Sequence, residues 1–333
     1  MIFSNVKIYK PYQVFLIALR KIYMYFVPTR NEMARISDAD EISELIIRKL
    51  NSEEPFMITR FGAVELCCLT NHIGIINGHK NPVKYITGSS PAWWYDEGNR
   101  FCMKNNAGFF PNDNDSLFKF GELLLNDIKF IDVLASWLPD EWRFRSYFPD
   151  ADIISFNGLD PFWSKTPWTK ALIGKKVLVV HPFSEEIKYQ YYNNRERLHN
   201  NPDILPLFSL ETIKAVQSIG GSNAFSTWFD ALHYMEKEID KKDYEVCLIG
   251  CGAYGMPLAA HVKRQGKQAI HMGGTLQLLF GIRGKRWETP EYGKCFFSDG
   301  IGKYPSLMNE YWIRPFKSSI FDGAEKVENY CYW

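Results

Sequence analysis

A glycine-rich turn near residue 250 carries the clearest chemical pattern in the sequence. Gly250, Gly252 and Gly255 have the spacing G-x-G-x-x-G, between an apolar run over 246–249 and a predicted helix over 256–265. Glycines let the backbone turn sharply and approach an anion, and a helix start offers unpaired N–H groups and the positive end of a dipole. The turn therefore predicts a phosphate or nucleotide site. The alternative is a turn that serves only close packing.

The strand predicted after this helix lacks the acidic residue of a dinucleotide site. It spans 268–274 and contains His271, Gly273 and Gly274, but no Asp or Glu. A NAD site usually places a carboxylate near the end of this strand, where it binds the ribose hydroxyls. The pattern therefore favours a phosphate-holding turn over a NAD site, with these three residues as candidates for nucleotide contact.

A second strand, turn and helix unit begins near residue 56. The apolar run over 56–59 predicts a strand, and Gly62 lies in the turn before a helix that starts near Ala63. Arg60 then lies at the carboxyl end of the strand, and Glu65 lies in the first helical turn. Both are predicted to face the crevice where open α/β sheets bind ligands.

Strands that alternate with helices predict the elements that position these residues. The fold class is α/β, with a mainly parallel, doubly wound, Rossmann-like sheet and helices on both faces. We expect one domain over 36–333, with lobes of roughly 36–150 and 151–333. Other predicted elements are strands over 153–156 and 177–180, a helix capped by Ser37, and a helix over 223–241 whose aromatic stripe belongs to the core.

Composition narrows the classes of partner. The 333 residues are 46% hydrophobic, and Lys+Arg 39 against Asp+Glu 38 leave a formal charge of +1, so no global field marks a nucleic-acid-binding protein. Seven cysteines at irregular spacing, without paired C-x-x-C motifs, favour a reducing compartment and no structural zinc. Cys247 and Cys251 are predicted to be small buried thiols.

The first 35 residues form a basic, amphipathic segment. Its apolar stretches over 14–19 and 23–27 are interrupted by Arg20 and Lys21, and neither is long enough to span a bilayer. One hypothesis is that the segment lies on an anionic membrane surface. The alternative is a helix packed on the body of the protein, or an oligomer contact.

Aromatic residues also gather in an irregular stretch over 88–111. They are mixed with glycine, proline and amide residues and follow neither helical nor strand spacing. Aromatic faces pack on the apolar faces of sugar rings, and amides bind hydroxyls. The stretch is therefore predicted to be a loop that lines a sugar site.

The segment Arg60-Phe61-Gly62-Ala63-Val64-Glu65 resembles the Arg-x-Gly-(Asp)-x-Glu segment of bacterial glycosyltransferases with the GT-D fold, enzymes of surface polysaccharide and glycoprotein assembly. The stretches 248–255, 271–274 and 281–287 are also similar to sequences of such proteins. The resemblance implies a GT-D-like fold, a nucleotide-sugar donor and a divalent cation, Mn²⁺ or Mg²⁺.

In that family, the Asp and Glu of a D-x-E pattern serve the cation and the nucleotide diphosphate. This chain has Ala63 in place of the Asp and retains Glu65. The resemblance therefore carries over Glu65 as the candidate carboxylate for metal or substrate, with Arg60 and Gly62 beside it. The replacement by Ala63 leaves metal dependence open.

Transfer from a nucleotide sugar develops negative charge on the departing diphosphate, which cations or N–H donors stabilise. Arg283, Lys285 and Arg286 follow a predicted helix over 275–280, in a glycine-punctuated loop. This loop is predicted to fold over the diphosphate and to replace a missing metal ligand. The alternative is a solvated surface loop.

An inverting transferase also needs a carboxylate or His to take the proton of the acceptor hydroxyl. Glu65 and His181, which ends the predicted strand over 177–180, are the catalytic candidates. Glu185 and Glu186 are further candidates, but a carboxylate at the start of the following helix also has a capping role.

The resulting hypothesis is a cytoplasmic glycosyltransferase at the inner face of a membrane. It would transfer a sugar from a nucleotide sugar to a lipid-linked or protein-linked surface glycan, without a nucleic-acid partner. One alternative is a Rossmann-type enzyme with a nucleotide cofactor, a dehydrogenase or methyltransferase. Another is a non-catalytic nucleotide- or glycan-binding scaffold of an envelope polysaccharide assembly complex, with which Ala63 is consistent.

Overall fold

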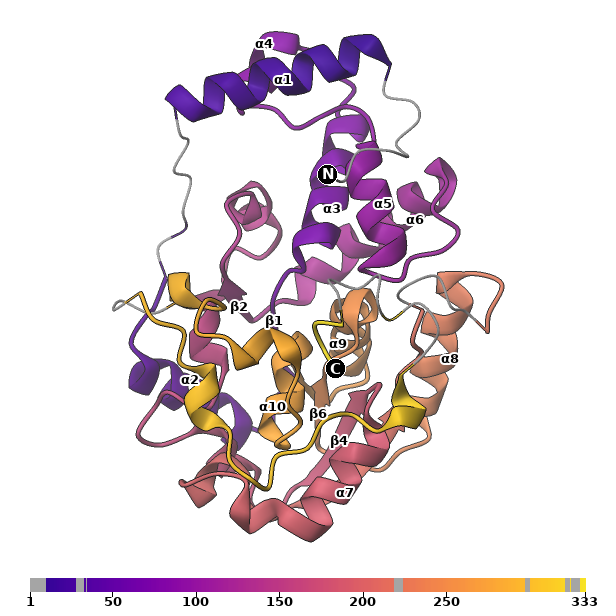
Figure 1. The fold of residues 1–333 in the computed structure, drawn as a ribbon. Coiled ribbons are helices and arrows are strands. Elements are labelled where there is room, and N and C mark those ends of the chain that lie inside the picture. The colour runs from indigo at the N-terminus through magenta and orange to yellow at the C-terminus, as the bar shows by residue number, and fades with distance from the viewer. Residues whose placement is uncertain are drawn as a thin grey trace.

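Seven parallel strands form one sheet in the order β3-β2-β1-β7-β6-β4-β5 (Figure 1). The computed structural model describes residues 10–27, 33, 35–218, 224–296, 300–320, 324 and 330–333. The strands are β1 (Met57–Thr59), β2 (Val133–Ser136), β3 (Asp152–Ser155), β4 (Lys176–His181), β5 (Ser209–Lys214), β6 (Val246–Ile249) and β7 (Gln268–His271). The all-parallel sheet confirms the predicted fold class.

The central strands are apolar on both sides because both faces of the sheet are covered. Along β4, Leu178 and Val180 point into one hydrophobic cluster, whereas Val177 and Val179 point into the other. Side chains alternate between the two faces of a strand, so one short run of Val and Leu supplies both cores.

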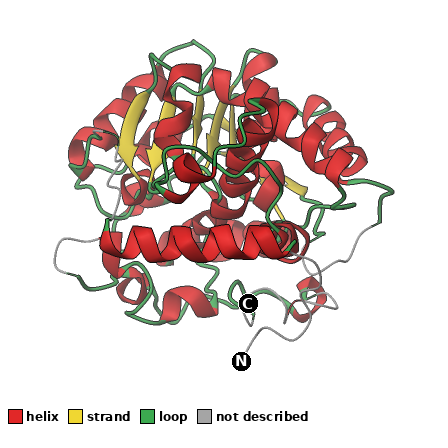
Figure 2. Ribbon diagram, turned by 90° about the horizontal axis from the view of Figure 1, so that it is seen from above, coloured by secondary structure: helices red, strands yellow, loops and turns green. Residues whose placement is uncertain are grey.

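Helices pack on both faces of this sheet (Figure 2). Those that contribute to the first cluster are α3 (Ala63–Ile76), α5 (Glu97–Asn105), α6 (Asn114–Asp127), α8 (Trp228–Asp240) and α9 (Gly255–Arg264). Those that contribute to the second are α2 (Ala39–Asn51), α7 (Ser184–Asn194) and α10 (Leu276–Leu279). Two further helices, α1 (Pro11–Phe26) and α4 (Pro82–Ile86), lie together at one end of the molecule.

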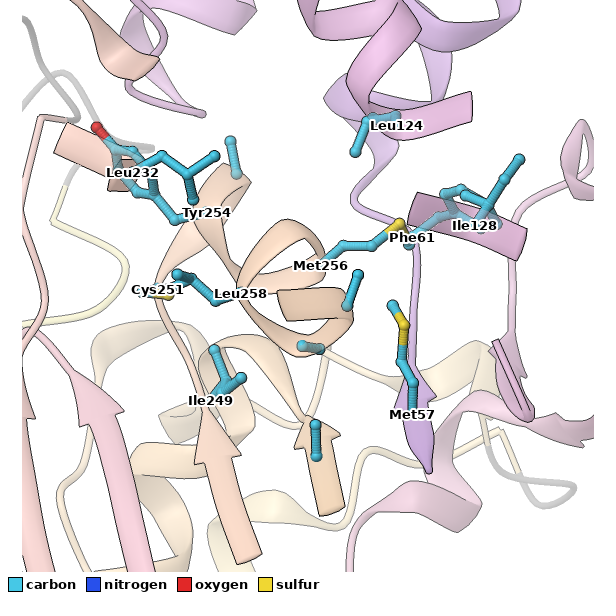
Figure 3. Close-up of a cluster of buried hydrophobic side chains, with 14 of the residues drawn as sticks. Met57, Phe61, Leu124, Ile128, Leu232, Ile249, Cys251, Tyr254, Met256 and Leu258 are labelled. Carbon is cyan, nitrogen blue, oxygen red and sulfur yellow. The ribbon is translucent and has the colours of Figure 1, made fainter. Parts of the chain in front are cut away.

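Helix α9 anchors the glycine-rich turn to the core. Figure 3 shows Met256 and Leu258 of α9 in one buried cluster with Ile249 of β6 and Met57 of β1. Phe61, which follows β1, is fully buried in the same cluster. The turn after β6 and the turn after β1 are therefore held by a shared set of apolar contacts.

The chain leaves adjacent strands toward opposite faces of the sheet. Along the sheet order β1-β7-β6-β4, the helices that follow these strands are α3, α10, α9 and α7, and they join the first and second clusters in alternation. Connections that diverge in this way open a crevice at the carboxyl ends of the strands, where open α/β sheets bind ligands.

Several predicted boundaries shift, and two strands escaped prediction. Asp38, not Ser37, caps α2, since its Oδ1 accepts from the N–H groups of Asp40 and Glu41. Helix α8 starts at Trp228 behind a Thr227 cap, while residues 219–223 lie outside the described part of the chain. Strands β2 and β5 were not predicted. The aromatic stripe of α8 does belong to the core, as expected.

The stretch 88–111, predicted to be a loop that lines a sugar site, fits that prediction only in part. Asn106 and Ala107 line a cavity at the carboxyl ends of the central strands, whereas the tryptophans pack against α1. Trp94 is buried with Leu16 of α1, and the ring of Trp93 lies 6.4 Å from that of Tyr12. The stretch also contains a regular helix, α5. Trp93 and Trp94 hold α1 in place, because rings this large are costly to leave in water, whereas Phe109 packs on Phe120 and Trp228 in the main core.

Helix α1 packs on the protein through one side, as in the second alternative considered for the N-terminal segment. Arg20 donates to the carbonyl oxygens of Tyr85 and Ser90, at 2.7 and 3.3 Å. Residues 1–9, 28–32 and 34 of the predicted segment lie outside the described residues. Among the described helices, none combines the length and apolarity needed to cross a membrane.

Candidate functional site

A cavity of about 220 Å³ lies at the carboxyl ends of β1, β7, β6 and β4. Residues 60–65 and 250–254 both line it, so the two turn segments lie together in space. The predicted site residues among its lining are Arg60, Gly62, Glu65, His181, Gly250, Gly252, His271, Gly273, Gly274 and Arg286. Gly255, Arg283 and Lys285 are not part of the lining.

Each of the three positions of the motif requires glycine, but not for the same structural reason. A Cβ on Gly250 would lie 2.6 Å from the carbonyl oxygen of Gly273, and one on Gly255 would overlap the His271 ring. Both positions therefore serve close packing. Gly252 has φ +59 and no close contact, so it makes the left-handed turn that exposes the backbone to the cavity.

Two helices begin at the cavity, and their first turns differ in charge. In α3, Glu65 lies in the first turn, and its carboxylate folds back over Gly62. In α9, the first turn has no acidic residue, and no side chain caps it. The N–H of Gly255 donates to the carbonyl oxygen of Gly252, and Pro257 has no N–H, so few donors remain at this helix start. The start of α9 therefore contributes mainly the positive end of its dipole, and its first turn carries no carboxylate.

Glu65 is a carboxylate in a poorly solvated place. Burial raises its pKa, against the opposing effects of its own backbone N–H and the guanidinium of Arg60. A raised pKa brings a carboxylate closer to the range in which it takes protons efficiently. The same position also explains a capping role, because carboxylates are favourable in the first helical turn.

Arg60 is held between aromatic rings at the cavity wall. Its guanidinium carbon lies 4.9 Å from the centre of the Phe156 ring and 5.4 Å from that of Trp137. Within the described residues, its buried Nε has no hydrogen-bond partner, and no carboxylate forms an ion pair with it. A fixed cation with an unmet donor suits an anionic ligand.

The two histidines of the site are neutral. Burial lowers the pKa of His181 to about 3, and burial together with Arg60 lowers that of His271 to about 3. Nδ1 of His181 accepts from the N–H of Phe183 at 3.0 Å, so Nε2 carries the proton. His181 is therefore arranged to donate a hydrogen bond rather than to abstract a proton. His271 shares a hydrogen bond with Thr59.

The three basic residues of the loop after α10 have different surroundings. Arg286 lines the cavity and is oriented by Tyr332, whose hydroxyl accepts from Nη1 at 3.2 Å. Arg283 donates to the carbonyl oxygens of Asn309 and Trp312 outside the cavity lining. Lys285 is exposed. All three residues were predicted to cover a diphosphate, but only Arg286 lies at the cavity.

Two buried carboxylates near Arg60 escaped the sequence analysis. Burial raises the pKa of Glu141 to about 7 and that of Asp160 to about 6, and Arg60 lowers both in part. Oε2 of Glu141 accepts from the N–H of Trp137 at 3.1 Å, and Oδ2 of Asp160 accepts from the Tyr304 hydroxyl at 2.7 Å. Both follow strand ends, but one of these strands, β2, was not predicted.

The implied divalent cation finds no ready set of ligands here. Across the part of the chain that the structure describes, no three His, Cys, Asp or Glu side chains are grouped as a metal site. In the segment that lines the cavity, Glu65 follows Gly62, Ala63 and Val64, so this segment supplies no second carboxylate. Mg²⁺ in nucleotide sites is commonly held by one or two carboxylates together with substrate phosphates, so Glu65 would need a bound diphosphate and water to complete the coordination of such an ion.

Comparisons with known proteins add little. No protein-family model matches the chain, and none of the curated proteins matches it. Two similar solved structures are described as "Selenomethionine substituted structure of domain of unknown function 1792" and "The highly conserved domain of unknown function 1792 has a distinct glycosyltransferase fold". Both are 14% identical and cover 78% of this chain and 82% of theirs, with TM-scores of 0.33 and 0.28. At these scores, the similarity carries no conclusion about activity.

Glu141 predicts a measurable pH effect on stability. Its pKa rises from a usual 4.5 to about 7 in the folded protein, so between these values the folded state binds more protons than the unfolded chain. The free energy of unfolding should therefore fall as pH rises through this window, by on the order of 1 to 3 kcal/mol from this group. Urea denaturation below and above the window should show a smaller decline in Glu141→Gln.

The exposed Glu185→Gln variant is the control for Glu141→Gln, and it should keep the wild-type pH dependence. An equal decline in Glu141→Gln and wild type would show that Glu141 ionises as an ordinary surface carboxyl does.

Proposed function

We propose that the cavity binds the diphosphate of a nucleotide sugar and that the protein is a glycosyltransferase. The observation that carries the proposal is the joint presence of Arg60, Arg286 and the start of α9, whose first turn has no acidic residue, around one cavity. Two guanidinium groups and a positive helix end favour a ligand with concentrated negative charge.

The same groups suit the chemistry of transfer. When the sugar leaves, negative charge develops on the diphosphate, and fixed donors stabilise this charge without reorganisation. Arg60 is held by rings and Arg286 by Tyr332, so neither needs to be ordered during the reaction. In this proposal, both residues perform the charge stabilisation that a cation provides in the family that the sequence resembles.

Glu65 is proposed as the base that takes the proton of the acceptor hydroxyl. Glu65 lines the cavity next to the end of β1, while the glycine turn lines it next to the end of β6, with β7 between these two strands. Burial raises the pKa of Glu65. His181 is proposed to donate from Nε2 to the donor substrate, because its Nδ1 is already engaged. The GT-D assignment and a surface glycan as acceptor rest on the sequence resemblance, and a cytoplasmic location rests on the seven cysteines without paired motifs.

Nucleotide binding separates this proposal from its alternatives. We expect UDP or GDP to raise the melting temperature, since a ligand that binds only the folded state at 100 times its Kd adds about 2.7 kcal/mol. NAD and S-adenosylmethionine should leave it unchanged, because β7 ends in His271 without a carboxylate for the ribose. Differential scanning fluorimetry checks this. Stabilisation by NAD alone would instead support a nucleotide-cofactor enzyme.

Arg286→Ala and Lys285→Ala form a matched pair within one loop. Arg286 lines the cavity, whereas Lys285 is exposed and outside its lining. Loss of a charged hydrogen bond should weaken nucleotide diphosphate binding roughly 10- to 100-fold in Arg286→Ala, and the binding should be sensitive to salt. Isothermal titration should show wild-type affinity for Lys285→Ala. Equal affinities for both variants would remove Arg286 from the site.

Glu65→Gln tests the proposed base. The change keeps the shape of the side chain and removes its charge, so we expect turnover to fall about a hundredfold or more, with little change in melting temperature. Release of nucleoside diphosphate from a panel of nucleotide sugars measures turnover, and Glu185→Gln is the exposed control. A large loss of stability with retained specific activity would make Glu65 a helix cap. Nucleotide binding without turnover of any donor by wild type would favour the scaffold alternative.

A further inference from the structure

Helix α1 packs on the rest of the protein through one side and is exposed on the other. Leu16 is buried against the aromatic cluster of residues 85–94, and Arg20 donates to two carbonyl oxygens there. In the view from above, the long helix α1 crosses in front of the rest of the molecule (Figure 2). Its contacts with the protein are therefore confined to its inner face.

The outer face is apolar. Large exposed side chains occur at positions 14, 15, 22, 25 and 26, and Phe15, Tyr25 and Phe26 are 61%, 82% and 75% exposed. At 100° per residue, these positions fall on one continuous stripe along the helix. An apolar stripe of this kind on a soluble domain marks an interaction surface rather than a solvated helix.

The charges beside this stripe have one sign. Lys10 and Lys21 are exposed, and both fall along one edge of the stripe. The neighbouring helix α4, which packs against α1, begins after exposed Lys80 and contains exposed Lys84. No Asp or Glu occurs over 10–27 or 66–95, although acids and bases are balanced across the whole chain. The next acid, Asp96, caps α5.

We propose that the outer face of α1 binds the surface of an anionic phospholipid bilayer. An apolar stripe with aromatic side chains enters the boundary between headgroups and acyl chains, while adjacent lysines attract anionic headgroups. Because one side of α1 is packed on the protein and the apolar stripe runs along the other, the helix lies in the plane of the surface, and its 16 residues span about 24 Å there. A protein partner would have to supply a matching acidic rim, whereas an anionic bilayer supplies it everywhere.

The position of α1 relates the bilayer to the cavity. Helix α3 begins at the cavity with Ala63 and ends at Ile76, one short loop before α4, which packs on α1 (Figure 1). Its 14 residues span about 21 Å. Membrane binding does not depend on the proposed function, but it would place the cavity about one helix length from lipid-borne acceptors.

Vesicle flotation of the full chain tests the proposal. We expect binding to phosphatidylcholine vesicles that contain phosphatidylglycerol, weaker binding to phosphatidylcholine alone, and a decrease with added salt. Phe15→Ser with Phe26→Ser should weaken binding at least about tenfold. Lys10→Gln and Lys21→Gln should each weaken binding roughly fivefold.

The control changes two exposed apolar residues just before the amino ends of β4 and β5, away from α1 (Figure 1). Ile173 and Leu207 are 57% and 65% exposed, and they precede β4 and β5. Ile173→Ser with Leu207→Ser should bind vesicles as the wild type does. Circular dichroism checks that each variant is folded. If the Phe15 and Phe26 changes unfold the protein, the lysine variants still test the proposal.

Three results would overturn the proposal. The first is absence of vesicle binding by the wild type, and the second is unchanged binding by both the Phe and Lys variants. The third is a dimer, seen by light scattering, that the Phe15 and Phe26 changes dissociate while vesicle binding stays absent. That result would assign the outer face of α1 to a second copy of the chain. None of these three results depends on nucleotide binding, which is measured separately.

Discussion

The alternation of helices between the two faces of the sheet is the constraint on which the site depends. Helices α3, α10, α9 and α7 leave four adjacent strands toward opposite sides, so their connections cannot close over the strand ends. The cavity is the space that this divergence leaves. Apolar contacts around α9 then fix its walls, because Met256 and Phe61 belong to one buried cluster.

Charge inside the cavity follows from which groups the fold leaves without partners. Glu65 occupies the start of α3, whereas the start of α9 has no carboxylate. Arg60 is held by rings instead of by an ion pair, so its positive charge is not neutralised by direct contact within the described residues. Nearby Glu141 has a pKa raised to about 7, so near neutral pH it places only part of a negative charge beside Arg60. The site is thus poised for an anion.

Local sequence patterns predicted the parts of the fold that depend on neighbouring residues. The strand over 246–249 and the glycine turn after it were predicted correctly, because an apolar run and a glycine spacing are visible within ten residues. Strand β2 was missed, and Trp137 and Glu141 with it, since three apolar residues and a serine between two helical segments do not distinguish a strand from a helix end. The aromatic stretch over 88–95 was misread because its partner, α1, lies more than 60 residues away in the chain.

The sequence by itself determined the α/β class, the two turn segments and the amphipathic character of the first helix, since each is a property of short-range spacing. Only the tertiary structure decided that Arg286 faces the cavity while Arg283 binds backbone carbonyls, and that Gly255 packs on His271. It also decided which side of α1 is covered. These choices depend on contacts between segments far apart in the chain, and the geometry of such contacts is set by packing rather than by local pattern.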